Sequence, residues 1–209
     1  MQKGSISKCT QCRREGEKLF LKGEKCNSAK CAMVKRNYPP GQHGGKGHGR
    51  MSNYGTHLRE KQKAKRQYGL KEAQFYNYFK KAEQQKGDTA ESLTRLLETR
   101  LDNVVYRLGI GTSRVLSRQL VNHGHFLVNG RSTDIPSYQV RPNETITVKP
   151  NRLTKKYFQD TIKRIAKHEP PVWLTLDKDK LEGKVLALPS AEDLKQNFQT
   201  QLIIEFYSR

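Results

Sequence analysis

Apolar residues recur along several stretches of the chain with the spacing of helices. Between positions 89 and 108 this spacing predicts one long amphipathic helix with a buried face. The buried stripe consists of Leu93, Leu96, Leu97, Leu101, Val104, Val105 and Leu108. Further helices are predicted over 53–66, 72–85, 114–122 and 155–168. The helix over 53–66 is strongly basic and has almost no apolar face, which indicates contact with an anionic surface.

Short strands are predicted in the C-terminal half. The stretch 126–128 precedes Asn129-Gly130, the preferred two-residue turn of a β-hairpin. A third strand is predicted over 145–149, where apolar residues alternate. Two helices followed by a small antiparallel sheet, within an otherwise helical chain, indicate an α+β fold. The remaining pieces predicted to be extended are 173–176, 184–189 and 202–207.

The charge balance points to a polyanionic partner. The 209 residues include 40 Lys and Arg against 20 Asp and Glu, which gives a net charge of +20. Such self-repulsion favours binding to nucleic acid. The chain has no apolar run long enough to span a bilayer, and its first five residues lack the apolar core typical of a signal peptide. We therefore expect no membrane partner and a reducing compartment such as the cytoplasm. The glycine-rich basic stretch 41–50 is expected to become ordered mainly on RNA.

All four cysteines lie within the first 31 residues, as Cys9-x2-Cys12 and Cys26-x4-Cys31. This spacing is typical of a four-thiolate zinc site, and nearby Lys and Arg are expected to lower the thiol pKa values. Four thiolates leave no coordination position for water, so the predicted zinc is structural. The spacing alone leaves an iron–sulfur cluster, two disulfides or free thiols as alternatives.

A second group of candidate residues follows position 113. Arg114 and Arg118 are one helical turn apart and share a face of the predicted helix 114–122. Together with the residues after that helix they predict an edge that binds phosphates: His123, Gly124, His125, Asn129 and Arg131. In the alternative interpretation the arginines only neutralise acidic residues of the same module: Glu98, Asp102 and Glu144.

Several segments carry a resemblance to a known family. They are CRREGEKLFLKGEKC (12–26), YPPGQHG (38–44), LREKQK (58–63), LDNVVYRLG (101–109), SRQLVNHGH (117–125) and IEFYSR (204–209). Over nearly its whole length the chain resembles the small-subunit ribosomal protein S-four family of bacteria and organelles, in its zinc-bearing branch.

The resemblance implies a domain organisation and a function. It implies a zinc-binding extension over 1–44, a mainly helical domain made of 45–98 with 162–209, and an inserted RNA-binding module over 99–161. It further implies a non-enzymatic component of the small subunit that binds its rRNA, nucleates assembly of the subunit body and influences translational accuracy. The implied partners are the ribosomal proteins S-five and S-three and the mRNA where it enters the subunit, with no small-molecule substrate.

Candidate rRNA contacts are distributed over the basic stretches. In the first 66 residues they are Arg13, Arg14, Lys22, Arg36, Gln42, His43, Lys46, Arg50, Arg59, Lys61, Lys63 and Arg66. Two other functions fit the sequence less well. An RNA-modifying enzyme, such as a pseudouridine synthase, would need a catalytic domain for which little chain remains. A zinc-containing DNA-binding regulator would need its basic residues concentrated in one helix beside the zinc loop.

Overall fold

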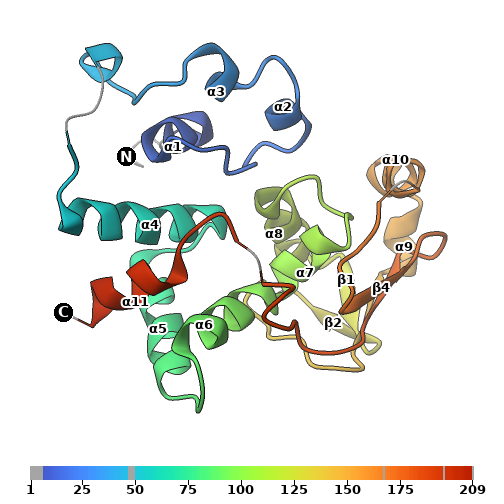
Figure 1. Cartoon of the computed structure of the whole chain (residues 1–209). Coiled ribbons are helices and arrows are strands. Elements are labelled where there is room, and N and C mark those ends of the chain that lie inside the picture. Colours follow the sequence, from blue (N-terminus) through green and yellow to red (C-terminus); the bar gives the residue numbers. More distant parts are fainter. Residues whose placement is uncertain (1–6, 47–49, 167, 195, 209) are drawn as a thin grey trace, which may run out of the picture. The chain divides into compact units, whose positions relative to one another are not determined.

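The computed structural model describes residues 7–46, 50–166, 168–194 and 196–208 (Figure 1). The chain divides into two compact units. The first unit is Met1–Phe79 with Gln196–Arg209, and the second unit is Lys80–Lys195. This division differs from the expected domain boundaries, since 80–98 and 162–195 lie in the same compact unit as 99–161.

The first unit is helical in its described residues. Its elements are α1 (Lys8–Glu15), α2 (Glu24–Asn27), α3 (Ala32–Lys35), the 3-10 helix η1 (Gly44–Lys46), α4 (Asn53–Gln67), α5 (Glu72–Glu83), which continues into the second unit, and α11 (Thr200–Tyr207). The Oγ of Ser52 accepts a hydrogen bond from the Gly55 backbone N–H and caps α4. The predicted helices over 53–66 and 72–85 are confirmed to within two residues.

The C-terminal segment corrects one prediction. Residues 202–207 were expected to be extended because of their β-branched and aromatic side chains, but α11 is a helix that packs along α4. Its Ile203 is fully buried, and the Tyr207 ring lies 4.9 Å from that of Phe79, centroid to centroid. Burial against two helices therefore decides the conformation over intrinsic strand preference.

The second unit combines helices with one antiparallel sheet. Its helices are α6 (Thr89–Glu98), α7 (Leu101–Arg107), α8 (Arg114–Asn122), α9 (Pro150–Leu153) and α10 (Lys156–Ile165). Its strands are β1 (Phe126–Val128), β2 (Arg131–Thr133), β3 (Thr145–Val148), β4 (Leu174–Asp177) and β5 (Glu182–Val185). The sheet order is β2-β1-β3-β5-β4. The hairpin around Asn129-Gly130 is confirmed, with Val128 opposite Arg131.

The later strands explain the different domain division. β5 pairs with β3 and β4 pairs with β5, so the pieces predicted as extended after 172 complete the sheet of the module. Gly183 of β5 lies so close to α7 that a Cβ there would come within 2.4 Å of the Leu108 side chain. The segment is therefore part of the module's core and not of a separate helical domain.

The single helix predicted over 89–108 is broken into α6 and α7. At the break Arg100 is extended and forms a β-bridge with Gln139, while the Thr99 carbonyl accepts a hydrogen bond from the Val140 backbone N–H. The apolar stripe of α7 still lies in the core, with Phe126, Ile146 and Trp173. Hydrogen bonds to a distant segment thus interrupt a helix that local spacing favours.

No helix in the described part of the chain has the length and apolar character needed to cross a bilayer.

Candidate nucleic-acid interface

The four cysteines converge in the first unit. Cys9 and Cys12 lie on α1, Cys26 lies in α2, and Cys31 precedes α3. All four side chains line one cavity of about 10 Å³, which is room for a single water-sized particle. They are free thiols, and the Lys22 backbone N–H donates a hydrogen bond to the Cys26 sulfur at 3.3 Å.

The pKa of one cysteine in this cluster, Cys12, differs from the sequence-based expectation. Burial raises the pKa of the Cys12 thiol, and the charges of the other three cysteines raise it further. The net shift of the Cys12 pKa is therefore opposite in direction to the lowering that was predicted. Among the described residues, no group of three or more His, Cys, Asp or Glu side chains stands in an arrangement that could hold a metal ion. Zinc at these cysteines stays a prediction.

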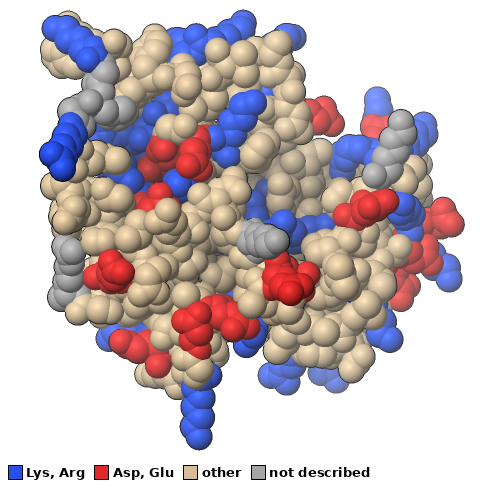
Figure 2. Space-filling model, in the orientation of Figure 1, with Lys and Arg blue, Asp and Glu red and all other residues tan. Residues whose placement is uncertain are grey.

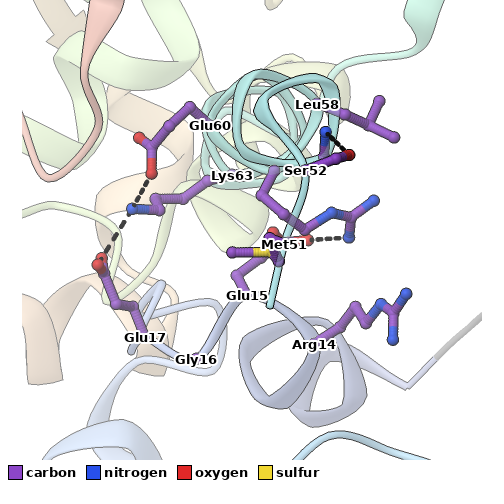
Figure 3. A pocket seen from close by; sticks show the side chains of 11 residues that line it. Arg14, Glu15, Gly16, Glu17, Met51, Ser52, Leu58, Glu60 and Lys63 are labelled. Carbon is purple, nitrogen blue, oxygen red and sulfur yellow. Dashed lines mark hydrogen bonds and ion pairs between the residues drawn. The ribbon is translucent and has the colours of Figure 1, made fainter. Parts of the chain in front are cut away.

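Two candidate contacts on α4 are directed inward. The Lys61 ammonium lies 2.5 Å from Glu72 Oε1. The Lys63 ammonium lies 2.8 Å from Glu60 and 3.0 Å from Glu17 (Figure 3). Lys61 and Lys63 are only 4% and 6% exposed. The expectation that both lysines bind RNA phosphates needs correction, because each is buried in ion pairs within the chain.

The pKa of Glu72 is strongly lowered by its partners. Burial opposes ionisation of its carboxyl, yet hydrogen bonds from Lys61, Lys65 and Tyr207 lower its pKa to about 2. The pairs also join α4, α5 and α11, so the cations on this side of α4 stabilise the helical packing.

Arg59 and Arg66 share one carboxylate. Both guanidinium groups pair with Oε1 of Glu15, whose side chain is fully buried. Burial raises the pKa of the Glu15 carboxyl, while Arg66 and Arg59 oppose that change. A hollow of about 640 Å³ lies beside this group and is bordered by the exposed Arg14 (Figure 3). Arg59 and Arg66 are thus partly buried, and their shared pairing with Glu15 holds α1 against α4.

A loop beside α1 brings other candidates together. Arg13 donates hydrogen bonds to the carbonyls of Tyr38 and Pro39 at 2.9 and 3.0 Å, which holds the loop in place. Gly44 packs so tightly there that a Cβ would come within 1.9 Å of the Pro39 oxygen. Arg14, Gln42 and His43 border a hollow of about 260 Å³.

The cations that the first unit presents outward lie mainly before α4. Basic side chains are visible over the α1–α3 part at the top of Figure 2. The exposed candidates there are Arg14, Lys22, Arg36, Lys46 and Arg50. Within the expected RNA-ordered stretch 41–50, residues 44–46 form η1, whereas 47–49 lie outside the described residues.

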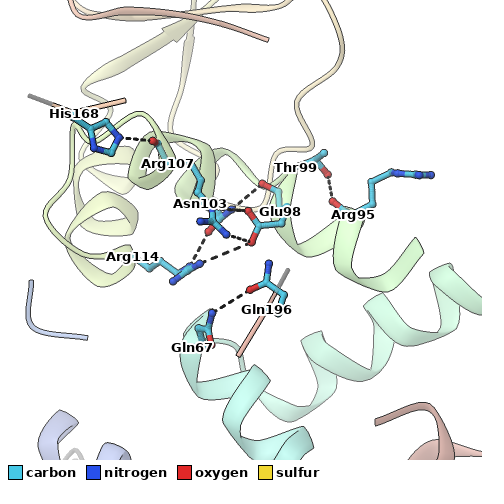
Figure 4. Close-up of polar contacts among 9 residues, drawn as sticks. All are labelled: Gln67, Arg95, Glu98, Thr99, Asn103, Arg107, Arg114, His168 and Gln196. Carbon is cyan, nitrogen blue, oxygen red and sulfur yellow. Dashed lines mark hydrogen bonds and ion pairs between the residues drawn. The ribbon is translucent and has the colours of Figure 1, made fainter. Parts of the chain in front are cut away.

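In the second unit the arginine face is tied to buried acids. Glu98 receives two hydrogen bonds from Arg107, at 2.8 and 2.9 Å, and one from Asn103 at 2.8 Å (Figure 4). Arg114 donates to the Asn103 side-chain oxygen at 2.8 Å, lies 3.9 Å from Glu98 and covers the Tyr106 ring. Arg114 therefore fits the alternative interpretation, in which the arginines neutralise acidic residues of the same module.

The Arg118 side chain is more exposed than that of Arg114. Its guanidinium lies 3.9 Å from Asp102, which is already bound by the buried Arg100 at 2.7 and 3.0 Å. The Arg118 side chain is 31% exposed. Its outer nitrogen atoms can therefore reach a phosphate while its inner side remains close to Asp102.

We expect Arg118→Ala to weaken rRNA binding by about 1–2 kcal/mol and to reduce the slope of log affinity against log salt by about one, as for one lost phosphate contact. Arg114→Ala should instead lower the melting temperature, because it leaves Glu98 with fewer partners. Salt titrations and thermal melts of both variants measure this. An unchanged affinity and slope in Arg118→Ala, with a lowered melting temperature, would assign that arginine to the fold.

The other predicted edge residues do not all lie together. His123 and His125 precede β1, whereas Asn129 and Arg131 follow it, so the two pairs are separated by a strand of about 10 Å. The Asn129 side-chain oxygen accepts a hydrogen bond from the Thr145 backbone N–H and holds the turn. The single edge expected from the sequence is thus two sites at opposite ends of β1.

The structure adds three cations that the sequence-based list omitted. Lys149, Arg152 and Lys155 act electrostatically on His125, and the Lys149 ammonium lies 3.7 Å from the position that a Cβ on Gly124 would occupy. Their regular spacing of three residues was visible in the sequence. Only the pairing of β1 with β3 brings the end of β3 beside the turn that precedes β1.

Two protein-family models match the chain. The one described as "Ribosomal protein S4/S9 N-terminal domain" matches residues 5–98, and the one described as "S4 domain" matches residues 99–146.

Curated bacterial proteins match over nearly the full length. Small ribosomal subunit protein uS4A of Alkaliphilus oremlandii is 55% identical over 201 residues, which cover 96% of each chain. The protein of the same name from Alkaliphilus metalliredigens is 53% identical with the same coverage. Small ribosomal subunit protein uS4 of Pelotomaculum thermopropionicum is 51% identical over 206 residues, or 99% of this chain and 98% of that protein.

Proposed function

We propose that the chain binds small-subunit rRNA directly, because it belongs to the ribosomal protein S-four family. Members of this family are structural components of the small ribosomal subunit and not enzymes. The observation that carries the proposal is the basic surface before α4. The cations of this surface are exposed and can contact RNA phosphates, whereas Lys61 and Lys63 of α4 are buried in ion pairs within the chain. Phosphate contacts would supply most of the affinity, and the shape of the folded RNA would supply the specificity.

We further propose a role early in assembly. A protein that holds RNA through two separate units can fix the relative positions of RNA helices that meet at a junction. In this proposal the chain nucleates the subunit body, contacts the ribosomal proteins S-five and S-three, and influences translational accuracy near the point where mRNA enters. The bacterial cytoplasm would be its location. These details rest on the family resemblance and on the two-unit architecture.

We also propose one structural zinc ion held by Cys9, Cys12, Cys26 and Cys31. The support is the donor set, since four thiols from three short segments line one cavity of about 10 Å³. Zinc would draw the sulfurs into a tetrahedral arrangement that the described side chains do not already form. The Lys22 N–H bonded to the Cys26 sulfur is the kind of outer contact that orients a thiolate ligand. A bound zinc would neutralise the thiolate charges and cross-link α1, α2 and the start of α3.

Ribonucleoprotein purification tests the proposed function. The full chain, tagged at one end and expressed in its own host, should copurify with small-subunit rRNA and small-subunit proteins. Purified protein should bind transcribed rRNA with an affinity that falls steeply with salt. Recovery with modified tRNA, or with promoter DNA, would instead support the modifying enzyme or the DNA-binding regulator.

A further inference from the structure

A compact group of cations surrounds the turn between α8 and β1 in the second unit. It consists of His123 and His125 on either side of Gly124, with Lys149, Arg152 and Lys155 from the segment after β3. We call these residues the Gly124 cluster. The Lys149 backbone N–H donates a hydrogen bond to the His125 carbonyl at 2.9 Å, which ties the two segments together. The His125 ring packs edge-on against Phe158 of α10, with ring centroids 5.6 Å apart.

The cluster lacks the acidic partners that other cations of this unit have. Arg107 and Arg114 are bound to the Glu98 network, and Arg100 is bound to Asp102. Within the described residues, by contrast, no ion pair joins Lys149, Arg152 or Lys155 to a carboxylate. Two buried nitrogen atoms of the cluster, Arg152 Nε and His125 Nδ1, also have no hydrogen-bond partner in the described chain.

Converging cations without acids carry an electrostatic cost in the free protein, which an external anion would remove. Gly124 has a φ of +63°, and it leaves the backbone open beside the Lys149 ammonium. Lys149 is half-buried and Lys155 is exposed, so the positive charge reaches the surface. The geometry therefore suits a small, strongly charged group such as a phosphate.

We propose that the Gly124 cluster binds backbone phosphates of the rRNA through Lys149, Arg152 and Lys155, and that His125 takes up a proton when the phosphate arrives. This inference rests on the proposed function and adds a second contact surface, distinct from the Arg118 face. The proton enters from solvent onto the imidazole, which has neutral and cationic forms, and no covalent bond is made to the RNA.

The proton uptake follows from the surroundings of His125. Burial lowers the pKa of its imidazole, and the positive charges of Lys155, Arg152, His123 and Lys149 lower it further. The four charged groups with the largest effects on His125 are all positive. A bound phosphate would offset them and raise the pKa. The His125 pKa is therefore higher in the RNA complex than in the free protein. Affinity for RNA should increase as the pH falls through the range between these two pKa values.

The test compares two triple variants of the full-length, metal-replete protein binding to transcribed small-subunit rRNA. Lys149→Ala/Arg152→Ala/Lys155→Ala should lose affinity by about tenfold or more at 0.15 M salt, and its salt slope should fall by about two. The matched control, Lys163→Ala/Lys180→Ala/Lys184→Ala, removes the same charge from exposed positions of the same unit and should lose less than about threefold. Equal losses in the two variants would overturn the proposed site.

A second measurement addresses the proton. Between pH 8 and pH 6 the wild-type affinity should rise by about threefold or more at constant salt, and His125→Gln should remove most of that rise. The same pH dependence in His125→Gln as in wild type would overturn the role of His125.

Two checks keep the outcomes distinct. Circular dichroism melts identify a variant that fails to fold, and the exposed Lys155→Glu then replaces the triple variant, with the same expected direction. Wild-type protein that fails to bind rRNA would refute the proposed function itself. Wild-type protein that binds, with a triple variant that equals its control, would refute only the Gly124 cluster.

Discussion

Glu98→Ala is expected to destabilise the second unit by about 3–5 kcal/mol, because it leaves a cluster of cations without its buried acid. Glu98 is only 1% exposed and accepts three side-chain hydrogen bonds from Arg107 and Asn103. Arg114 lies 3.9 Å away and depends on the same charge. Removing the carboxylate forces these groups to find water or to separate, and α6, α7 and α8 would move apart.

Denaturant titration followed by tryptophan fluorescence measures this loss. The single tryptophan, Trp173, is 4% exposed in the core of the second unit, so its emission reports on that unit. Glu91→Ala is the matched control, since Glu91 pairs with Arg95 one turn along the same helix and is about one-third exposed. That control should cost about 0.5 kcal/mol or less. A loss below about 1 kcal/mol for Glu98→Ala would show that the network contributes little to stability.

Removing the proposed zinc is expected to unfold α1 to α3 while the second unit stays folded. The apolar core of this region is small and consists of Cys12, Leu19 and Leu21 with Met33 packed against them. Such a core is too small to order some 40 residues without a cross-link. Structural zinc in small domains contributes about 10–16 kcal/mol of apparent binding free energy, which is also folding free energy.

Purified wild-type protein should contain about one zinc per chain. A strong chelator, or Cys26→Ser, should make residues before α4 sensitive to protease while Trp173 emission is unchanged. Ser28→Ala lies between the two last cysteines and should keep both the metal and the resistance. Metal-free protein with full protease resistance would show that the thiols are ordinary core residues, and iron in place of zinc would change the identity of the metal.

Local signals in the sequence were sufficient for several elements. Ser113 caps α8 as expected from its position before the helix, since its Oγ accepts a hydrogen bond from the Leu116 backbone N–H. Asn129-Gly130 forms the hairpin turn with both residues at positive φ. In each case the deciding contact joins residues a few positions apart, so neighbouring residue types are enough to predict it.

Which lysines and arginines are buried in ion pairs, and which are exposed, could not be predicted in the same way. Lys63 pairs with Glu17, 46 positions earlier, and also donates to the Asn197 carbonyl, 134 positions later. Its near partner Glu60, three positions earlier, does not by itself predict burial, because such pairs also form on exposed helix surfaces. Conversely, the sequence did not indicate Lys149 and Lys155 as candidates. They act on His125, which precedes β1, whereas the two lysines follow β3 and are distant from it in the sequence.

Local sequence patterns were therefore enough to predict a basic α+β protein with four clustered cysteines, most of its helices and its hairpin, and to reveal its family resemblance. The tertiary structure decided the break at Thr99-Arg100, the helical state of α11, the extension of the sheet by β4 and β5, and which cations are buried in ion pairs. The physical reason is the range of the interactions. Periodicity, capping and turn chemistry act between near neighbours, whereas burial and ion pairing depend on which distant segments the fold brings into contact.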